Sequence, residues 1–271
     1  MRKISIGENK EIIGGKNIIY STDAIAKYYT FHRIKWDDFY LSERWIFERV
    51  AGAKRSLGRV LDVGCAVGGL GCALLEQFSV AEYVGIDINR QAIEIAKSGK
   101  SSYPIGRCHF MCGDILEMET LPAEGFDNVF SLSCADWNIR TRDIINGCWR
   151  YVVKGGHFVL TLRLTSEDSL SDIEKSHQYI CFEDEAVECM EGFERAPYVV
   201  FNANEAITML NRLDPKPARI IAYGYYGKPS PSARTMYDRL CFTALAVRKG
   251  GDEDQHPETL GEFHLPVDLL F

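Results

Sequence analysis

Acidic residues end three successive apolar runs of the chain, and their spacing suits the binding of one ligand. Asp62, Asp87 and Asp114 each come at or just after a short run of the kind that forms a buried strand. Parallel strands end at one edge of a sheet, where ligands bind in the crevice outside the carboxyl ends. Because a carboxylate accepts hydrogen bonds, Asp62 suits a positive amino group, Asp87 a pair of ribose hydroxyls and Asp114 an adenine amino group.

A glycine-rich loop follows the first of these acids and leads into a predicted helix. Glycine lets the backbone approach a ligand closely, and a helix N-terminus directs N–H groups at it. The dinucleotide pattern needs glycine at the first, third and sixth loop positions, which here hold Gly64, Ala66 and Gly69. A second pattern, an acid two residues before the first glycine and a glycine four after it, is met by Asp62, Gly64 and Gly68. Since the Asp62 carboxylate would repel a pyrophosphate, the second pattern is favoured over the dinucleotide pattern. Asp87 on the next strand does not discriminate, because both kinds of cofactor carry a ribose.

The order of these motifs resembles that of the class I methyltransferases that depend on S-adenosylmethionine (SAM). Leu-Asp-Val-Gly-Cys-Ala-Val-Gly is followed by Gly-Ile-Asp, Gly-Asp-Ile and Phe-Asp-Asn-Val-Phe-Ser, over about residues 58–165 and more loosely in two late strands. The resemblance implies an α/β fold with a doubly wound, mostly parallel, seven-stranded sheet, helices on both faces and an antiparallel last strand. It also implies SAM as the cofactor and methyl transfer as the activity. A nicotinamide-dependent oxidoreductase is the alternative.

By position, the resemblance assigns the cofactor to the ends of the first four strands. The methionine part would lie on the first acid and the glycine-rich loop, the ribose on the second acid, and the adenine on the third acid between two isoleucines. The expected cofactor residues are Asp62, Gly64, Cys65, Ala66, Gly68, Asp87, Ile88, Asp114, Ile115 and Ser133. Ala66 departs from the pattern, since many members have glycine there, but alanine is small enough to be accommodated.

The methyl acceptor is expected beside the end of the fourth strand. Asp136 is the candidate general base or acceptor-orienting residue, with capping of the next turn as the alternative, and Trp137 is a candidate wall. Arg163, at the end of the fifth strand, is predicted either to bind an anionic or hydroxylated acceptor or to form a surface ion pair. His177 is a weaker base candidate, and Arg44 is a candidate partner of the cofactor carboxylate. A base is needed only for a poorly acidic acceptor such as a hydroxyl.

The remaining candidate groups can be explained by structural roles. Tyr223, Tyr225 and Tyr226 end a late strand and either line the pocket or pack, while His157 starts a strand at the wrong end of the sheet for catalysis. No cluster of His, Asp or Glu has the spacing of a metal site, so a metal-free site is expected.

Strands that alternate with helices predict the elements that position these groups. Strands are expected at residues 59–63, 82–87, 108–112, 126–131, 157–164, 219–225 and 240–248, and helices at 36–50, 68–78, 90–97, 141–152 and 202–213. The predicted organisation is an N-terminal segment and leading helix (1–57), a SAM-binding domain (58–250) with an acidic, aromatic insertion or lid at about 165–201, and a C-terminal tail (251–271).

Composition narrows the class of partner. The formal net charge is −7, whereas duplex-binding proteins carry basic surfaces, and no Pro-Pro pair follows the fourth strand as in many amino-directed DNA methyltransferases. The nine cysteines include no Cys-x-x-Cys pair, which predicts buried free thiols in a reducing, cytoplasmic compartment. No secretory signal or membrane span is found in the sequence.

The function that these features favour is methyl transfer from SAM to a small molecule, with O-methylation of a sugar or secondary metabolite preferred. No nucleic-acid or membrane partner is expected, because of the acidic charge and the absence of an apolar span. Two alternatives remain open at this point: a methyltransferase acting on protein or RNA, and a SAM-binding protein without transferase activity.

Overall fold

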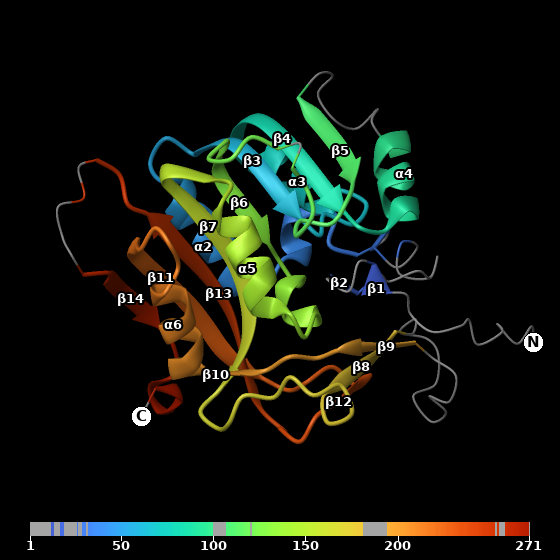
Figure 1. Cartoon of the computed structure of the whole chain (residues 1–271), viewed down its shortest axis with the longest axis vertical. Coiled ribbons are helices and arrows are strands. Elements are labelled where there is room, and N and C mark those ends of the chain that lie inside the picture. Colours follow the sequence, from blue (N-terminus) through green and yellow to red (C-terminus); the bar gives the residue numbers. More distant parts are fainter. Residues whose placement is uncertain are drawn as a thin grey trace, which may run out of the picture.

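The central element is a twisted sheet, and the carboxyl ends of several of its strands lie at one cavity. The computed structural model describes residues 32–99, 107–119, 121–180, 194–252, 254 and 258–270, with short pieces at 12–13, 17–18, 26 and 29–30. The strands of the sheet are β3 (Ser56–Val63), β4 (Ser79–Asp87), β5 (Cys108–Cys112), β6 (Phe126–Ser131), β7 (Val152–Thr165), β10 (Phe201–Asn202), β11 (Pro217–Gly227), β13 (Leu240–Lys249) and β14 (Leu260–His264). Their order is β14-β11-β13-β7-β6-β3-β4-β5, and the short β10 pairs with β7 (Figure 1).

The predicted α/β fold is confirmed, with a difference in strand count. All seven expected strands are present, and β13, the last of them, runs antiparallel to both β7 and β11. The other pairings in this sheet are parallel. The sheet has nine strands because β10 and β14 add to it, and β14 comes from the tail that the sequence left without a structure.

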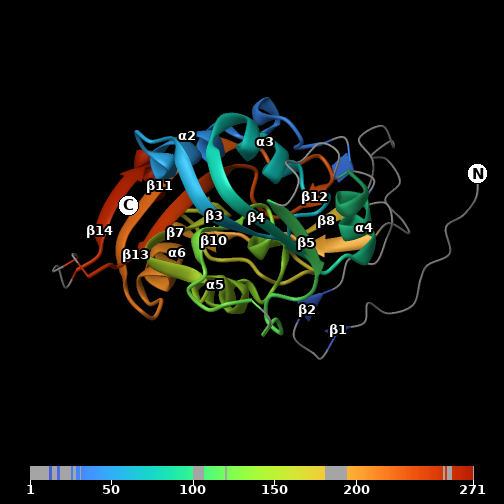
Figure 2. The same cartoon turned by 90° about the horizontal axis from the view of Figure 1, so that it is seen from above.

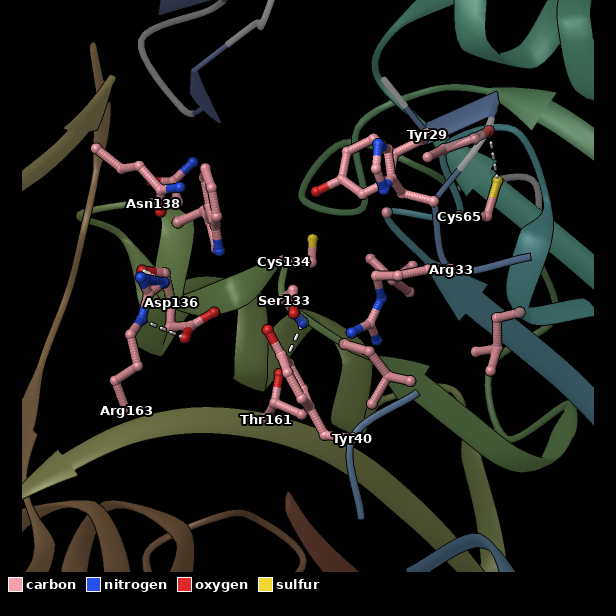
Figure 3. A pocket seen from close by; sticks show the side chains of 18 of the residues that line it. Tyr29, Arg33, Tyr40, Cys65, Ser133, Cys134, Asp136, Asn138, Thr161 and Arg163 are labelled. Carbon is pink, nitrogen blue, oxygen red and sulfur yellow. Dashed lines mark hydrogen bonds and ion pairs between the residues drawn. The ribbon is translucent and has the colours of Figure 1, made fainter. Parts of the chain in front are cut away.

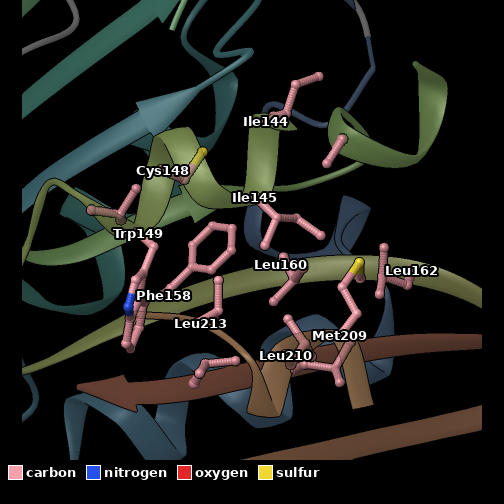
Figure 4. Packing of buried hydrophobic residues seen from close by; sticks show 14 of the residues in the cluster. Ile144, Ile145, Cys148, Trp149, Phe158, Leu160, Leu162, Met209, Leu210 and Leu213 are labelled. Atoms are coloured by element: carbon pink, nitrogen blue, oxygen red, sulfur yellow. The ribbon is translucent and has the colours of Figure 1, made fainter. Parts of the chain in front are cut away.

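Helices cover both faces of the sheet, as Figure 2 shows from above. The helices are α2 (Leu41–Ala51), α3 (Gly69–Gln77), α4 (Arg90–Ser98), α5 (Thr141–Trp149) and α6 (Ala203–Asn211). Phe47 of α2 and Leu74 of α3 belong to the buried cluster on one face. Cys148 of α5 and Leu210 of α6 pack around Phe158 of β7 on the other (Figure 4). Burial of each large apolar side chain contributes roughly 1.5–3 kcal/mol, so these helices hold the strand ends in fixed positions.

The single leading helix expected over residues 36–50 is wrong. The segment forms a 3₁₀ turn, η1 (Trp36–Asp38), followed by α2. The Asp38 carboxylate accepts hydrogen bonds from the main-chain nitrogens of Ile34 and Lys35, at 3.0 and 2.9 Å, which caps the start of this turn. Tyr40 is extended, with ψ of 151°, so a new helix starts after it.

The helix expected over 141–152 ends earlier, at Trp149, because β7 already begins at Val152. Gly155 lies inside that strand with a φ of +77°. Asn202 caps α6, accepting hydrogen bonds from the main-chain nitrogens of Asn204 and Glu205.

The segment at 165–201 contributes a second, smaller sheet. Within its described residues, β8 (His177–Ile180) and β9 (Glu194–Pro197) are antiparallel, and β12 (Ala233–Arg234) pairs with β8. Figure 1 shows this sheet beyond the carboxyl ends of the main strands. Two further short strands, β1 (Ile12–Ile13) and β2 (Asn17–Ile18), pair with each other.

The described cysteines are all free thiols, and Cys65, Cys108, Cys148 and Cys241 are buried. Cys181 and Cys189 lie outside the described residues. Within the described ranges, no helix is long and apolar enough to cross a membrane.

Candidate active site

A cavity of about 840 Å³ lies at the carboxyl ends of the main strands. Ligand pockets are commonly about 300–1,000 Å³, so this one has the size of a small-molecule or cofactor site. Its lining combines the loops after β3, β4 and β6 with residues of β8 and the loop after β11. Figure 3 shows Arg33 and Cys65 on one side of the cavity and Asp136 and Arg163 on the other. We refer to these sides as the cofactor end and the acceptor end.

The glycine-rich loop at the cofactor end has an unusual backbone, and the main-chain nitrogens of Gly64 and Cys65 donate to the Ile86 main-chain oxygen, at 2.8 and 3.0 Å. Gly64, Ala66 and Gly68 have φ values of +78°, +47° and +86°, which favour glycine. Gly64 also lies so close to the next loop that a Cβ there would be 2.5 Å from the Cys134 sulfur. Ala66 is strained by about 1–2 kcal/mol in this conformation. Its main-chain nitrogen donates to an Asp87 carboxylate oxygen at 2.9 Å, which fixes the loop.

Asp62 is a nearly fully buried acid in the floor of the cofactor end. It is 3% exposed, and Tyr83 donates its hydroxyl to the Asp62 carboxylate at 2.5 Å. Burial raises the pKa of Asp62 to about 7, opposed by the Tyr83 hydrogen bond. Arg33 nearby also lowers this pKa, and Asp87 raises it. A cation placed beside Asp62 would favour its ionised form.

Asp87 is held by two main-chain N–H groups. One oxygen accepts from Ala66 and the other from Asn89, at 2.9 and 2.8 Å. Burial raises the pKa of Asp87, and these two hydrogen bonds lower it. Each carboxylate oxygen has two acceptor sites, so capacity remains for a diol in the cavity.

Two of the predicted cofactor residues, Gly68 and Asp114, do not line the cavity. Ile88 and Ile115 do, together with Gly113, as expected for the walls of a flat ring. Asp114 is turned into its own loop, where one carboxylate oxygen accepts from the Leu116 main-chain nitrogen at 2.9 Å. Gly68 caps α3 and hydrogen-bonds back to the loop instead of facing the cavity. Asp62, Gly64, Cys65, Ala66, Asp87 and Ser133 all line it.

Ser133 lies at the junction between the two ends of the cavity. It has a φ of +47°, and its main-chain nitrogen donates to the Thr161 hydroxyl at 2.7 Å. Strained residues of this kind persist where surrounding contacts fix them, and they cluster at functional sites.

A buried ion pair dominates the acceptor end. The Arg163 Nε donates to Oδ2 of Asp136 at 2.9 Å, and its Nη2 donates to the Asp136 main-chain oxygen at 2.9 Å. The guanidinium carbon lies 3.8 Å from the centre of the Tyr198 ring and 5.5 Å from that of Trp137. Burial raises the pKa of Asp136, and Arg163 lowers it. Among the described residues, Oδ1 of Asp136 has no hydrogen-bond partner.

These contacts differ from both structural alternatives, which were capping of the next turn by Asp136 and a surface ion pair of Arg163. Asp136 lies inside a 3₁₀ turn, η3 (Ala135–Trp137), and its carboxylate is engaged by Arg163 and not by the next helix. Arg163 forms an ion pair as one alternative expected, but both side chains are only 5% exposed. The pair is therefore part of the cavity wall.

Several weaker candidates lie elsewhere. Arg44 pairs with Asp37 at the surface. The Nδ1 of His177 lies 2.9 Å from the Ile173 main-chain oxygen, and His177 does not line the cavity. Burial lowers the pKa of His157 to about 4, which suits the structural histidine that was predicted.

Of the three late tyrosines, Tyr225 lines the cavity, whereas Tyr223 packs on Trp45 and Tyr226 donates to Asp268.

Sequence reasoning missed lining residues at both ends. Arg33 lines the cofactor end, where it pairs with the fully buried Glu43 at 2.7 Å and lies 4.7 Å from the centre of the Phe39 ring. Tyr40 and Tyr198 line the cavity as well. Charged and aromatic residues do cluster between Arg33 and Tyr40 in the sequence, but their spacing is irregular and predicts no ligand contact.

Comparison with known proteins identifies the family. Residues 54–212, more than half of the chain, match the methyltransferase domain family. The chain belongs to this family. The prediction of a class I SAM-dependent methyltransferase is thereby confirmed, together with its fold.

Individual relatives match over part of their length. The chain is similar to 24-methylenesterol C-methyltransferase 2 of Oryza sativa subsp. japonica, with 31% identity over 124 residues, 44% of this chain and 34% of the relative. Malonyl-acyl-carrier-protein O-methyltransferase of Paenibacillus sp. (strain JDR-2) is 26% identical over 117 residues, 43% of this chain and 42% of the relative. The matches thus span less than half of the curated relatives.

Among solved structures, phosphoethanolamine N-methyltransferase 2 of Haemonchus contortus, in complex with SAM, shares the fold. The TM-score is 0.54 at 15% identity, covering 84% of this chain and 56% of that one. The residues described by the structure contain no group of three or more His, Cys, Asp or Glu side chains able to hold a metal ion.

Proposed function

We propose that this chain transfers the methyl group of SAM to a hydroxyl oxygen of a small acceptor, with a sugar or secondary metabolite as the favoured class. The single observation that carries the proposal is one cavity with cofactor-binding chemistry at one end and a buried carboxylate with an unpartnered oxygen at the other. The relatives that match methylate carbon, oxygen and nitrogen according to their names, so they do not choose the atom.

The groups at the cofactor end fit SAM. Asp62 is an acid that a cation would ionise, which suits the amino group of the methionine part, and Arg33 on the same wall suits its carboxylate. Asp87 is oriented to accept from the ribose hydroxyls, and Ile88 and Ile115 offer apolar walls to the adenine. When bound, SAM supplies a methyl group already activated on a sulfonium.

The acceptor end provides a base. Arg163 holds Oδ2 and the main chain of Asp136. Oδ1 is buried without a hydrogen-bond partner among the described residues, and it would accept the proton of an acceptor hydroxyl that displaces the side chains covering it. Burial raises the pKa of the Asp136 carboxyl, and Arg163 opposes that rise. General-base catalysis of this type contributes about 10²–10⁴-fold. Trp137 and Tyr198 would confine the acceptor so that its oxygen faces the methyl group.

The 165–201 segment supports a small acceptor over a macromolecule. Gln178, Tyr179, Ile180 and Tyr198 from this segment line the same cavity as the cofactor residues, so acceptor and cofactor would be enclosed together. We infer that this segment is the acceptor-binding part of the 58–250 domain. A protein or RNA substrate would need an open approach to Ser133.

The cofactor proposal is tested by calorimetric titration with SAM and, separately, with NADH. Micromolar binding of SAM without binding of NADH is expected. Binding of NADH alone would overturn the proposal and return the nicotinamide alternative.

The base is tested by following S-adenosylhomocysteine (SAH) release with an acceptor panel that begins with sugars. Asp136→Asn should lower turnover by at least about 10²-fold with SAH affinity unchanged. Asp143→Asn, an exposed acid on α5, is the matched control. Full turnover in Asp136→Asn would remove the carboxylate from catalysis. Tight SAH binding without turnover on any acceptor would favour a SAM-binding protein.

A further inference from the structure

The wall of the acceptor end that faces away from the cofactor loops is polar. Gln178 comes from β8, and Lys228, Ser230 and Ser232 come from the loop after β11, and all four line the cavity. None of them contacts the groups assigned to the cofactor or to proton transfer in the hydrogen bonds of the described residues. They are therefore available to recognise a part of the acceptor remote from the reacting oxygen.

Proton counting shows that Gln178, Ser230 and Ser232 present a hydrogen-bond donor. The Gln178 amide nitrogen lies 3.0 Å from the Ser232 hydroxyl oxygen and 3.4 Å from that of Ser230, and the two hydroxyl oxygens are 3.1 Å apart. Three contacts need three protons, and the amide NH₂ supplies two while one hydroxyl supplies the third. The proton of the second hydroxyl is left over and can be donated into the cavity.

The opposite orientation of the Gln178 amide does not satisfy the same contacts. Its oxygen would take both hydroxyl protons, so the Ser230–Ser232 contact would have no proton. The amide nitrogen orientation is therefore preferred. With both hydroxyl oxygens already accepting from Gln178, the group donates more readily than it accepts.

The charge of this wall has the sign that attracts an anion. The described acids that line the cavity are Asp62, Asp87 and Asp136, of which only Asp136 lies at the acceptor end, where Arg163 neutralises it. Lys228 is exposed and forms no ion pair with any residue in the described ranges. A cation next to a hydroxyl donor is the combination that binds carboxylate or phosphate oxygens.

We propose that Lys228, with the Gln178, Ser230 and Ser232 cluster, binds an anionic group of the acceptor, a carboxylate or a phosphate monoester. The proposal rests on the proposed function, since it names the class of acceptor for that same site. Tyr225 and Phe242 line the same cavity, so the body of the acceptor could pack on aromatic rings. The acceptor would then be an acid or phosphate ester whose hydroxyl reaches Asp136.

The test uses three probes of one shape: benzoate, phenyl phosphate and benzyl alcohol. The full chain is first titrated with SAH, and each probe is then titrated into the SAH-loaded protein by ligand-observed NMR or calorimetry. At least one anion should bind about tenfold more tightly than benzyl alcohol, the factor for about one charge-assisted hydrogen bond. The comparison of benzoate with phenyl phosphate distinguishes the two anion classes.

Variants locate the preference. Lys228→Gln should reduce the anion preference to within about twofold, and Gln178→Glu should abolish it by adding a charge and taking both serine protons. Lys54→Gln, an exposed lysine in the turn before β3 at the far end of the sheet, is the matched control and should keep the full preference.

Equal affinity for all three probes in the native chain, or an anion preference that survives Lys228→Gln, would overturn the proposal. Failure of SAH to bind is a separate result that contradicts the proposed function. In that case the same probes are titrated into the chain without SAH, and the ratio of anion affinity to benzyl alcohol affinity measured there tests the anion site.

Discussion

Replacement of Asp62 by asparagine should stabilise the protein without its cofactor while abolishing cofactor binding. Asp62 is buried in the floor of the cavity, and burial raises its pKa to about 7, against 3.8 for an ordinary aspartate. The folded protein therefore binds a proton at Asp62 more tightly than the unfolded chain does. A carboxylate that must ionise in this place costs folding free energy, and the amide of asparagine does not ionise.

The magnitude follows from the two pKa values. A folded pKa of about 7 and an unfolded one of 3.8 correspond to roughly 4 kcal/mol lost once the pH exceeds the folded value. Because the folded pKa of Asp62 is raised, its contribution to the free energy of unfolding is greatest below the unfolded pKa. This contribution falls as the pH rises towards 7 and is constant above that. New amide N–H groups without partners would cost about 1–3 kcal/mol, so the net gain of Asp62→Asn near pH 8 is about 1–3 kcal/mol.

Urea unfolding measures both effects. Between about pH 5 and pH 8, the free energy of unfolding of the native chain should fall by about 3 kcal/mol more than that of Asp62→Asn, a difference that does not depend on the cost of the amide. Asp238→Asn, an exposed acid, serves as the control and should follow the native chain. Calorimetric titration with SAH measures cofactor affinity, and no SAH binding is expected for Asp62→Asn. Parallel pH profiles for the native chain and Asp62→Asn would refute the reasoning.

Other changes test the remaining contacts. Asp87→Ala should weaken SAM affinity at least tenfold, through the loss of its charge-assisted hydrogen bonds to the ribose; unchanged affinity in a folded variant would remove Asp87 from the site. Arg163→Met should lower the free energy of unfolding by about 3–5 kcal/mol, because it leaves its carboxylate partner charged and buried, and a loss under about 1 kcal/mol in urea unfolding would contradict a buried pair. Gly64→Ala should cost about 1–3 kcal/mol more than Gly52→Ala, since both glycines have positive φ but only at Gly64 would a Cβ meet another side chain; equal losses would mean that close contact contributes nothing.

The fold could be predicted because the information is local. Each main strand contains a short apolar run, and these runs located all seven strands, with ends that differ by at most five residues. The strand ends fix the cofactor end as well, since parallel strands bring Asp62 and Asp87 to the same edge of the sheet. Asp114 lies at the same edge but does not line the cavity, because a position at this edge does not determine the direction of a side chain in a loop.

The acceptor end could not be predicted in the same way, because its contacts join distant parts of the chain. Arg163 and Tyr198 are buried against each other from β7 and from the segment after β9. The wall around Gln178 depends on the pairing of β8 with β12, and the register that sets Gln178 opposite Ala233 follows from no local pattern. The placement of β14 beside β11 is equally non-local.

One consequence of this construction is that acceptor binding and base placement are physically linked. The main-chain oxygen of Asp136 accepts hydrogen bonds from Arg163 and from the Val199 nitrogen, the latter at 3.0 Å. The neighbouring Val200 pairs with Leu170, and Tyr198 lies over the guanidinium of Arg163. The segment that lines the acceptor end thus also fixes the proposed base. Changes of this segment that alter the acceptor should therefore also alter the position of the Asp136 carboxylate.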